Sequence, residues 1–251
     1  MKSDRYLTFH RDFLICSPMI LFISDLHLSF DKPQITRHFI HFLQTKARQA
    51  SSVYILGDLF DVWVGDDDFT ATSAKVRREL KQLTDTGVNV YLQRGNRDFL
   101  ISERFARGTG VVLLDDYTVI ELEGQRTLLT HGDLLCSDDL AYQAFRVKSR
   151  TQAWQQNVLS KPLWLRLLAA RWYRLRSFWY KLKKSSDIMD VNQITVKHIM
   201  AQHDCSQLIH GHTHRAGKHE FMLNGVKATR FVLAEWSHHG GSVLSFGETS
   251  E

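Results

Sequence analysis

The sequence has few cysteines, few prolines and no long apolar run. Its 251 residues include 3 Cys and 3 Pro. The cysteines, Cys16, Cys136 and Cys205, are an odd number and form no C-x-x-C pair, so neither a zinc knuckle nor a disulfide framework is indicated. No apolar run approaches the roughly 18 residues of a transmembrane helix. With 43% hydrophobic and 24% charged residues, the chain is expected to be folded and to reside in a reducing cytoplasm.

Acidic residues are absent from residues 140–186, although this segment contains eleven Lys or Arg and four of the six Trp. The whole chain has 32 Lys and Arg against 27 Asp and Glu, a net charge of +5. Without the eleven cations, 21 basic residues face 27 acidic ones, so the rest of the chain carries −6. We interpret the segment as basic, aromatic and helical, with residues 163–184 as an amphipathic helical pair. It suits phosphates and an anionic membrane surface, although the same composition could bind nucleic acid or pack as a plain helical cap.

Short β-rich runs alternate with helical patterns in the first part of the chain. Strands are predicted over 19–24, 53–56, 88–92, 127–130 and 207–209, and helices over 33–49 and 72–86. This alternation predicts parallel strands covered by helices. Further strands over 221–223, 229–233 and 242–246, with an Asn224-Gly225 turn, predict a second, more antiparallel sheet.

The expected fold is therefore α/β, with two stacked mixed sheets flanked by helices and an inserted helical lid at about 140–186. Residues 1–18 are expected to be a dispensable N-terminal extension, because Met19 directly precedes the first predicted strand. Residues 19–251 would form the catalytic domain.

Five polar motifs follow apolar β-runs. They are D-x-H at 25–27, G-D-x-x-D at 57–61, G-N-R-D at 95–98, H-G-D at 131–133 and G-H-T-H at 211–214. Loops beyond the carboxyl ends of strands are where ligands bind in open α/β sheets, so these motifs are expected to converge. If D-x-H and H-x-H stay extended, both side chains of each motif point the same way. Glycines 57, 95, 132 and 211 are expected to permit sharp turns between the crowded loops.

These motifs supply seven candidate metal ligands: Asp25, His27, Asp58, Asn96, His131, His212 and His214. Carboxylate, amide and imidazole donors without thiolate suit Mn, Fe, Zn or related divalent ions better than Ca, and seven ligands are too many for one ion. Two ions sharing a carboxylate are implied, a site suited to phosphoryl transfer. A single such His is more often structural, so the prediction depends on the motifs occurring together.

The five motifs resemble those of the calcineurin-like metallophosphoesterases. The resemblance implies that Asp25, His27, Asp58 and His214 hold one ion. It implies that Asp58, Asn96, His131 and His212 hold the other, with Asp58 shared. Many relatives have His in the third position of G-N-x-D, where this chain has Arg97. Because Arg does not give up a proton at ordinary pH, Arg97 is expected to neutralise phosphoryl charge, which favours an anionic leaving group such as a phosphate monoester.

Within this group the chain resembles the UDP-2,3-diacylglucosamine pyrophosphohydrolase family of lipid A biosynthesis, through SDLHL, YILGDLFDVWVGDDD, GNRDFLI, HGDLLCSDDLAYQAFR, IMDVNQ and IHGHTHR. The resemblance implies attack by metal-bound water at the α-phosphorus, giving UMP and 2,3-diacylglucosamine 1-phosphate. It also implies two Mn²⁺ ions, a lid that accommodates the acyl chains, and peripheral attachment to the cytoplasmic face of the bacterial inner membrane. Neither nucleic acid nor an obligate protein partner is expected.

The same resemblance implies catalytic roles for Asp58, Asn96 and Arg97. The substrate contacts that it implies are Asn96, Arg97, Asp139, Ser177, Lys181, Lys184 and His212, with Lys181 where many members have a small polar residue. Two rival hypotheses remain. One is a nuclease or other dinuclear-metal phosphodiesterase with a basic cap, and the other is a metal-free scaffold, which the complete set of ligand residues disfavours.

Overall fold

The computed structural model describes residues 19–181 and 190–247, without the side chains of 175–181. The first of its two five-stranded sheets has the order β10-β1-β2-β3-β4. Its strands are β1 (Ile20–Ile23), β2 (Ser52–Leu56), β3 (Asn89–Gln93), β4 (Val112–Leu114) and β10 (Leu244–Phe246). Strands β1 to β4 run parallel, and β10 pairs antiparallel with β1. The carboxyl ends of β1, β2 and β3 therefore lie at one edge of the sheet, as the alternating sequence pattern predicts.

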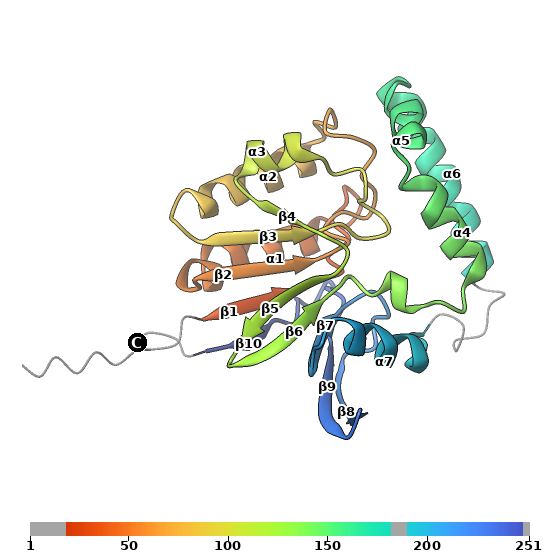
Figure 1. Ribbon diagram of the computed structural model, residues 1–251. Coiled ribbons are helices and arrows are strands. Elements are labelled where there is room, and N and C mark those ends of the chain that lie inside the picture. The colour runs from red at the N-terminus through yellow and green to blue at the C-terminus, as the bar shows by residue number, and fades with distance from the viewer. Residues whose placement is uncertain (1–18, 182–189, 248–251) are drawn as a thin grey trace, which may run out of the picture.

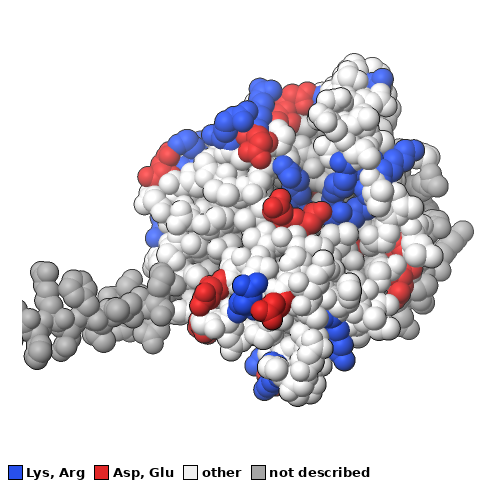
Figure 2. Space-filling model, viewed as in Figure 1, with Lys and Arg blue, Asp and Glu red and all other residues white. Residues whose placement is uncertain are grey.

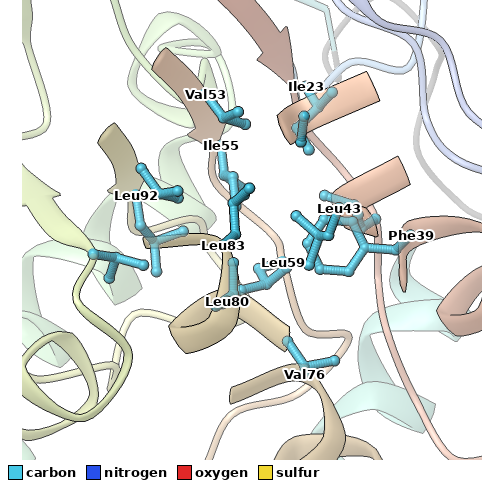
Figure 3. Packing of buried hydrophobic residues seen from close by; sticks show 14 of the residues in the cluster. Ile23, Phe39, Leu43, Val53, Ile55, Leu59, Val76, Leu80, Leu83 and Leu92 are labelled. Carbon is cyan, nitrogen blue, oxygen red and sulfur yellow. The ribbon is translucent and has the colours of Figure 1, made fainter. Parts of the chain in front are cut away.

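Three helices connect these parallel strands and bury one face of the sheet (Figure 1). They are α1 (Pro33–Gln44), which continues into the 3₁₀ turn Lys46–Gln49, α2 (Ala71–Thr84) and α3 (Glu103–Thr109). Figure 3 shows the apolar contacts, with Phe39 and Leu43 of α1 and Leu80 of α2 packed near Ile55 of β2. These residues recur at spacings of three and four along the helices, so one stripe of each helix enters the core.

The second sheet has the order β5-β6-β7-β9-β8. Its strands are β5 (Thr118–Leu122), β6 (Gln125–Leu129), β7 (Gln207–His210), β8 (Gly217–Leu223) and β9 (Val226–Val232). Strand β7 is parallel to β6 and β9, whereas β5 and β8 are antiparallel edge strands. Helix α7 (Gln193–Gln202) packs on this sheet through Val196 and Met200.

The two sheets face each other across a shared apolar layer. Tyr54 of β2 stacks between Phe22 of β1 and Tyr91 of β3, with ring centroids 4.9 and 4.6 Å apart. Leu129 of β6 and Ile209 of β7 belong to the same buried cluster. The architecture is thus two stacked mixed sheets flanked by helices, as predicted.

Of the α-helices described between β6 and β7, the first three stand as an arm beside the two sheets (Figure 1). We call residues 140–181 the helical arm; its helices are α4 (Leu140–Ser149), α5 (Gln152–Leu159) and α6 (Leu163–Lys181). The prediction of a helical pair over 163–184 was wrong as far as residue 181, because one uninterrupted helix spans 163–181. Residues 182–184 lie outside the described part of the chain. Among the described helices, none is both long and apolar enough to cross a bilayer.

The sequence placed three strands in the wrong sheet. Strands β6 and β7, which the alternation assigned to the parallel sheet, belong to the second sheet, and β10, which was assigned to the second sheet, is an edge of the first. Strands of one apolar pattern can join either of two sheets that share a core, so periodicity alone does not distinguish them. The N-terminal extension, residues 1–18, lies outside the described residues.

Candidate metal centre and active site

The loops after β1, β2 and β7 hold their candidate ligands in an uncommon backbone conformation. Asp25, His27, Asp58, His212 and His214 have φ angles of 54°, 49°, 52°, 69° and 57°. Non-glycine residues with positive φ are uncommon, and each costs of order 1–3 kcal/mol. The condition under which strand alternation would align the ligands, an extended D-x-H and H-x-H, is therefore not met. Left-handed turns, rather than strand alternation, direct these side chains to one place.

Three ligands form the first group. His214 Nε2 lies 3.4 Å from Asp25 Oδ1 and 3.4 Å from His27 Nε2. Asp25 is fully buried, and its other carboxylate oxygen accepts hydrogen bonds from the Ser24 hydroxyl and the His212 backbone N–H. The carboxylate is thus fixed by two donors while Oδ1 faces the imidazoles. Three donor atoms of this group lie within 4.8 Å of one another, close enough to bind one ion.

The second group surrounds His131. Its Nε2 lies 3.1 Å from Asn96 Oδ1, 3.2 Å from His212 Nδ1 and 3.8 Å from Asp58 Oδ1. His131 Nδ1 donates to the Leu56 carbonyl at 2.9 Å, which fixes the tautomer and leaves Nε2 free to act as a ligand. Asp58 also approaches the first group, because its Oδ2 is 3.7 Å from His27 Nδ1. The geometry therefore places Asp58 between the two groups.

The donor atoms fit a pair of divalent cations. Asp25 Oδ1 and His27 Nδ1 are buried without a hydrogen-bond partner among the described residues, a costly state that a bound ion would relieve. Burial raises the pKa of Asp58 to about 7, helped by the charges of Asp98 and Asp25 and opposed by those of His131 and Arg97. A buried carboxylate in this setting ionises fully when positive charge is supplied. The mixture of carboxylate, amide and imidazole donors matches first-row transition metals.

Two glycines allow the loops to approach this centre. A Cβ atom on Gly95 would lie 2.1 Å from Asp58 Oδ1, and one on Gly211 would lie 2.2 Å from Asp25 Oδ2. Neither glycine has positive φ, so they are needed for close backbone approach rather than for a sharp turn. The prediction that Gly95 and Gly211 permit sharp turns was therefore wrong, because glycine is needed at both positions to leave space for a neighbouring loop.

Comparison with known proteins identifies the family. The family description "calcineurin-like phosphoesterase" matches residues 18–216. This chain belongs to the calcineurin-like phosphoesterases. It is 48% identical over 227 residues to a UDP-2,3-diacylglucosamine hydrolase of Vibrio parahaemolyticus, covering 89% of this chain and 92% of the relative. It is 46% identical to the enzyme of that name from Aliivibrio fischeri, covering 91% and 95% of the two chains.

Among solved structures, this phosphoesterase is similar to vacuolar protein sorting 29 of Cryptosporidium parvum. The TM-score is 0.44 at 15% sequence identity, and the match covers 92% of this chain and 86% of the other.

Arg97 links the phosphoesterase centre to the helical arm. Its backbone N–H donates to Asp58 Oδ1 at 2.9 Å, its Nε is 3.5 Å from Asp58 Oδ2, and its guanidinium donates to Asp61 Oδ1 at 2.8 Å. Asp61 also forms an ion pair with Arg174 of α6. Asp98 accepts from the backbone N–H groups of Gly95 and Phe60 and so ties the two loops together. Asp61, which is buried, thus pairs with the guanidinium groups of both Arg97 and Arg174 beside the predicted ligands.

A cavity of about 710 Å³ opens next to these arginines. It lies between the arm and the loops after β2 and β3, and its lining is mainly apolar and aromatic. Its lining residues include Asn96, Arg97, Phe99, Trp154, Leu165, Ala170 and Trp172. Arg166 of α6 is buried and donates to the Val64 carbonyl and to Asp67, so that the arm is anchored to the β2 loop.

The predicted substrate contacts are only partly described. Asn96, Arg97 and His212 lie at the centre. Asp139 caps α4, since its side chain accepts from the Tyr142 backbone N–H at 3.1 Å, and its contact with substrate stays a prediction. The side chains of Ser177 and Lys181, and the whole of Lys184, lie outside the described residues.

Two acidic residues near the site, Glu235 and Asp133, have contacts that were not predicted from the sequence. Glu235, after β9, lies 2.7 Å from His214 Nδ1. Asp133 accepts from the Arg146 guanidinium at 2.8 Å and from the Tyr142 hydroxyl, and so joins the His131 loop to α4. Glu235 belongs to no spaced motif, and a single acid gives no signal of its own. Asp133 was visible within H-G-D, but its partners become neighbours only in the folded chain.

Proposed function

We propose that this phosphoesterase hydrolyses UDP-2,3-diacylglucosamine to UMP and 2,3-diacylglucosamine 1-phosphate in lipid A biosynthesis. The main structural support is that the predicted ligand cluster opens, past Arg97, onto a mainly apolar cavity of about 710 Å³. A substrate with a pyrophosphate and two acyl chains needs these two surfaces side by side. The names of the relatives with 46–48% identity agree with this substrate.

We propose two Mn²⁺ ions as the cofactor. Asp25, His27, Asp58 and His214 would hold one ion, and Asp58, Asn96, His131 and His212 the other. When bound, such a pair neutralises charge on phosphoryl oxygens and lowers the pKa of water. This donor set suits manganese, and elemental analysis of protein purified with Mn²⁺ should find two ions per chain.

The protein side chains orient the pyrophosphate and balance its charge. A guanidinium is a poor proton donor, so the role that fits Arg97 is to neutralise phosphoryl charge rather than to act as an acid. Asp61 holds Arg97 in place and pairs with Arg174, so two cations converge where the pyrophosphate would pass. The departing group is a phosphate monoester, whose second pKa is about 6, so it leaves as an anion without needing an acid. Water would attack the α-phosphorus, which leaves its oxygen in UMP.

We also propose that the protein binds the cytoplasmic face of the inner membrane peripherally. The arm exposes large apolar side chains, Leu140, Val147, Trp164, Leu168 and Trp172, between 59% and 76% exposed. Figure 2 shows acidic and basic side chains close together in the middle of one face, whereas the end of the arm is largely uncharged there. Exposed Trp and Leu beside Lys and Arg suit a membrane interface.

Turnover of the proposed substrate tests this function. Purified protein with Mn²⁺ should release UMP from UDP-2,3-diacylglucosamine, and Asp58→Ala should abolish both release and metal binding. Asp85→Ala is the matched control because Asp85 is exposed at the end of α2, away from the centre. Cleavage of RNA or DNA with no release of UMP would support the nuclease hypothesis and overturn the proposal.

A further inference from the structure

A second hollow, of about 610 Å³, adjoins the predicted ligands through Glu235. Glu235 Oε2 lies 2.7 Å from His214 Nδ1, and its Oε1 is 3.9 Å from His27 Nε2. The apolar cavity, in contrast, adjoins the centre through Asn96 and Arg97. The ligand cluster therefore has a separate hollow next to each of its two groups.

The second hollow differs chemically from the first. Seven of its ten lining residues are charged or polar, including Asp31, Lys32, Arg37 and Glu235. Acyl chains would gain little there, because burying such groups against hydrocarbon leaves them without hydrogen bonds. Its size lies within the roughly 300–1,000 Å³ of small-molecule sites. The occupant must be polar and must offer both donors and acceptors.

Donors without partners surround this hollow. Helix α1 begins with Pro33 at its first turn, and no side chain caps it, so its first N–H groups have no intrahelical acceptor. Trp236, only 3% exposed, lines the same hollow, and its Nε1 has no hydrogen-bond partner among the described residues. A buried indole N–H normally finds an acceptor. Trp236 is therefore a buried donor beside the hollow that lacks an acceptor among the described residues, and this observation is independent of the helix end.

We propose that this hollow binds the nucleoside of a nucleoside 5′-monophosphate, uridine in the proposed substrate, with the phosphate held at the ligand cluster. This assignment rests on the proposed function. The carbonyl oxygens of uracil are acceptors for Lys32, Arg37 and the α1 N–H groups, and the ribose hydroxyls are donors to Asp31 and Glu235. The acyl and nucleotide halves of the substrate then extend from the centre into different hollows.

Binding of UMP to the Mn²⁺-loaded protein tests this assignment without turnover. Titration calorimetry should show that Lys32→Gln/Arg37→Gln weakens UMP binding by about tenfold or more, since charge-assisted hydrogen bonds are lost. Binding of inorganic phosphate and of 2,3-diacylglucosamine 1-phosphate should change by less than about twofold. Lys46→Gln/Arg48→Gln is the matched control, because it removes the same charge from exposed residues at the other end of α1.

Three results would overturn the assignment. They are equal UMP affinity in the wild type and the Lys32/Arg37 variant, equal losses in the variant and the control, and wild-type UMP binding no tighter than inorganic phosphate. Photocrosslinking of 4-thiouridine monophosphate provides a second measurement, with labels expected in residues 31–38 or 235–238. Crosslinks confined to the helical arm would contradict it. Because neither assay needs hydrolysis, a protein that binds UMP here but does not cleave the lipid substrate would refute only the proposed function.

Discussion

Arg146 forms one buried and one exposed ion pair, so variants of this residue and its partners can compare how much each pair contributes to the free energy of unfolding. Its Nε lies 2.8 Å from Asp133 Oδ2, and its NH2 group lies 2.8 Å from Asp116 Oδ1. The two distances are equal, but the Asp133 side chain is 3% exposed and that of Asp116 is 47% exposed. We predict that Arg146→Met lowers the free energy of unfolding by about 3–5 kcal/mol, the usual cost of leaving a buried charge unpaired.

Asp133 contributes almost all of this loss. Burial raises its pKa, but the charges of His131 and Arg146 and the Tyr142 hydroxyl outweigh that effect and hold the pKa well below 3.8. A lowered folded-state pKa gives stability that is fully present above pH 3.8 and is lost as the pH falls through the folded value. At pH 7 the whole contribution is therefore measurable. Asp116→Asn should cost only about 0–1 kcal/mol, because water screens an exposed pair.

Urea unfolding at pH 7 provides the assay. Single variants Arg146→Met, Asp133→Asn and Asp116→Asn are compared with the double variant Asp133→Asn/Arg146→Met. The double variant should lose less than the sum of its singles by about 2 kcal/mol or more, since no charge is left unpaired. A loss below about 1 kcal/mol for Arg146→Met, or equal losses for the two Asp variants, would refute the reasoning.

Three further predictions concern the centre and the cavity. Gly95→Ala should lower kcat by about 100-fold or more and reduce metal occupancy, because the added Cβ would lie 2.1 Å from Asp58 Oδ1. Gly108→Ala is the control and should have no such effect, because the space around its Cβ is open. Burial lowers the pKa of His210 from 6.5 to about 4. As the pH falls from 6.5 to 4, His210 is therefore protonated in the unfolded chain before it is protonated in the folded protein, and the folded protein loses stability. His210→Gln should remove about 3 kcal/mol of this acid-induced loss, measured by urea unfolding at both pH values. Ala170→Trp, which fills part of the apolar cavity, should raise KM for the diacyl substrate with unchanged metal content, and an unchanged KM would contradict acyl binding there.

The convergence of the five motifs could be predicted from the sequence because it follows from topology. Parallel strands end at one edge of a sheet, and each motif directly follows an apolar run, so Asp25, Asp58 and Asn96 had to lie near one another. His131 and His212 follow strands of the second sheet, and they join the site because the two sheets stack with their strand ends aligned at the centre.

The backbone conformation of the ligand loops and the contacts of isolated residues such as Glu235 and Arg174 could not be predicted. The left-handed backbone at Asp25 and His27 depends on tertiary packing. Asp and His tolerate this conformation better than most residues, but they adopt others far more often, so D-x-H alone does not predict it. Glu235 and Arg174 are single residues far along the chain from the groups they contact, His214 and Asp61. Spacing within a motif carries no information about such contacts.

Hydrolysis of UDP-2,3-diacylglucosamine in ¹⁸O-labelled water, followed by mass spectrometry of both products, tests the central claim most directly. The account predicts release of UMP and 2,3-diacylglucosamine 1-phosphate in the presence of Mn²⁺, with the label in UMP. Label in the sugar phosphate would contradict attack at the α-phosphorus. Absence of both products from protein whose two metal sites are loaded would contradict the proposed activity itself.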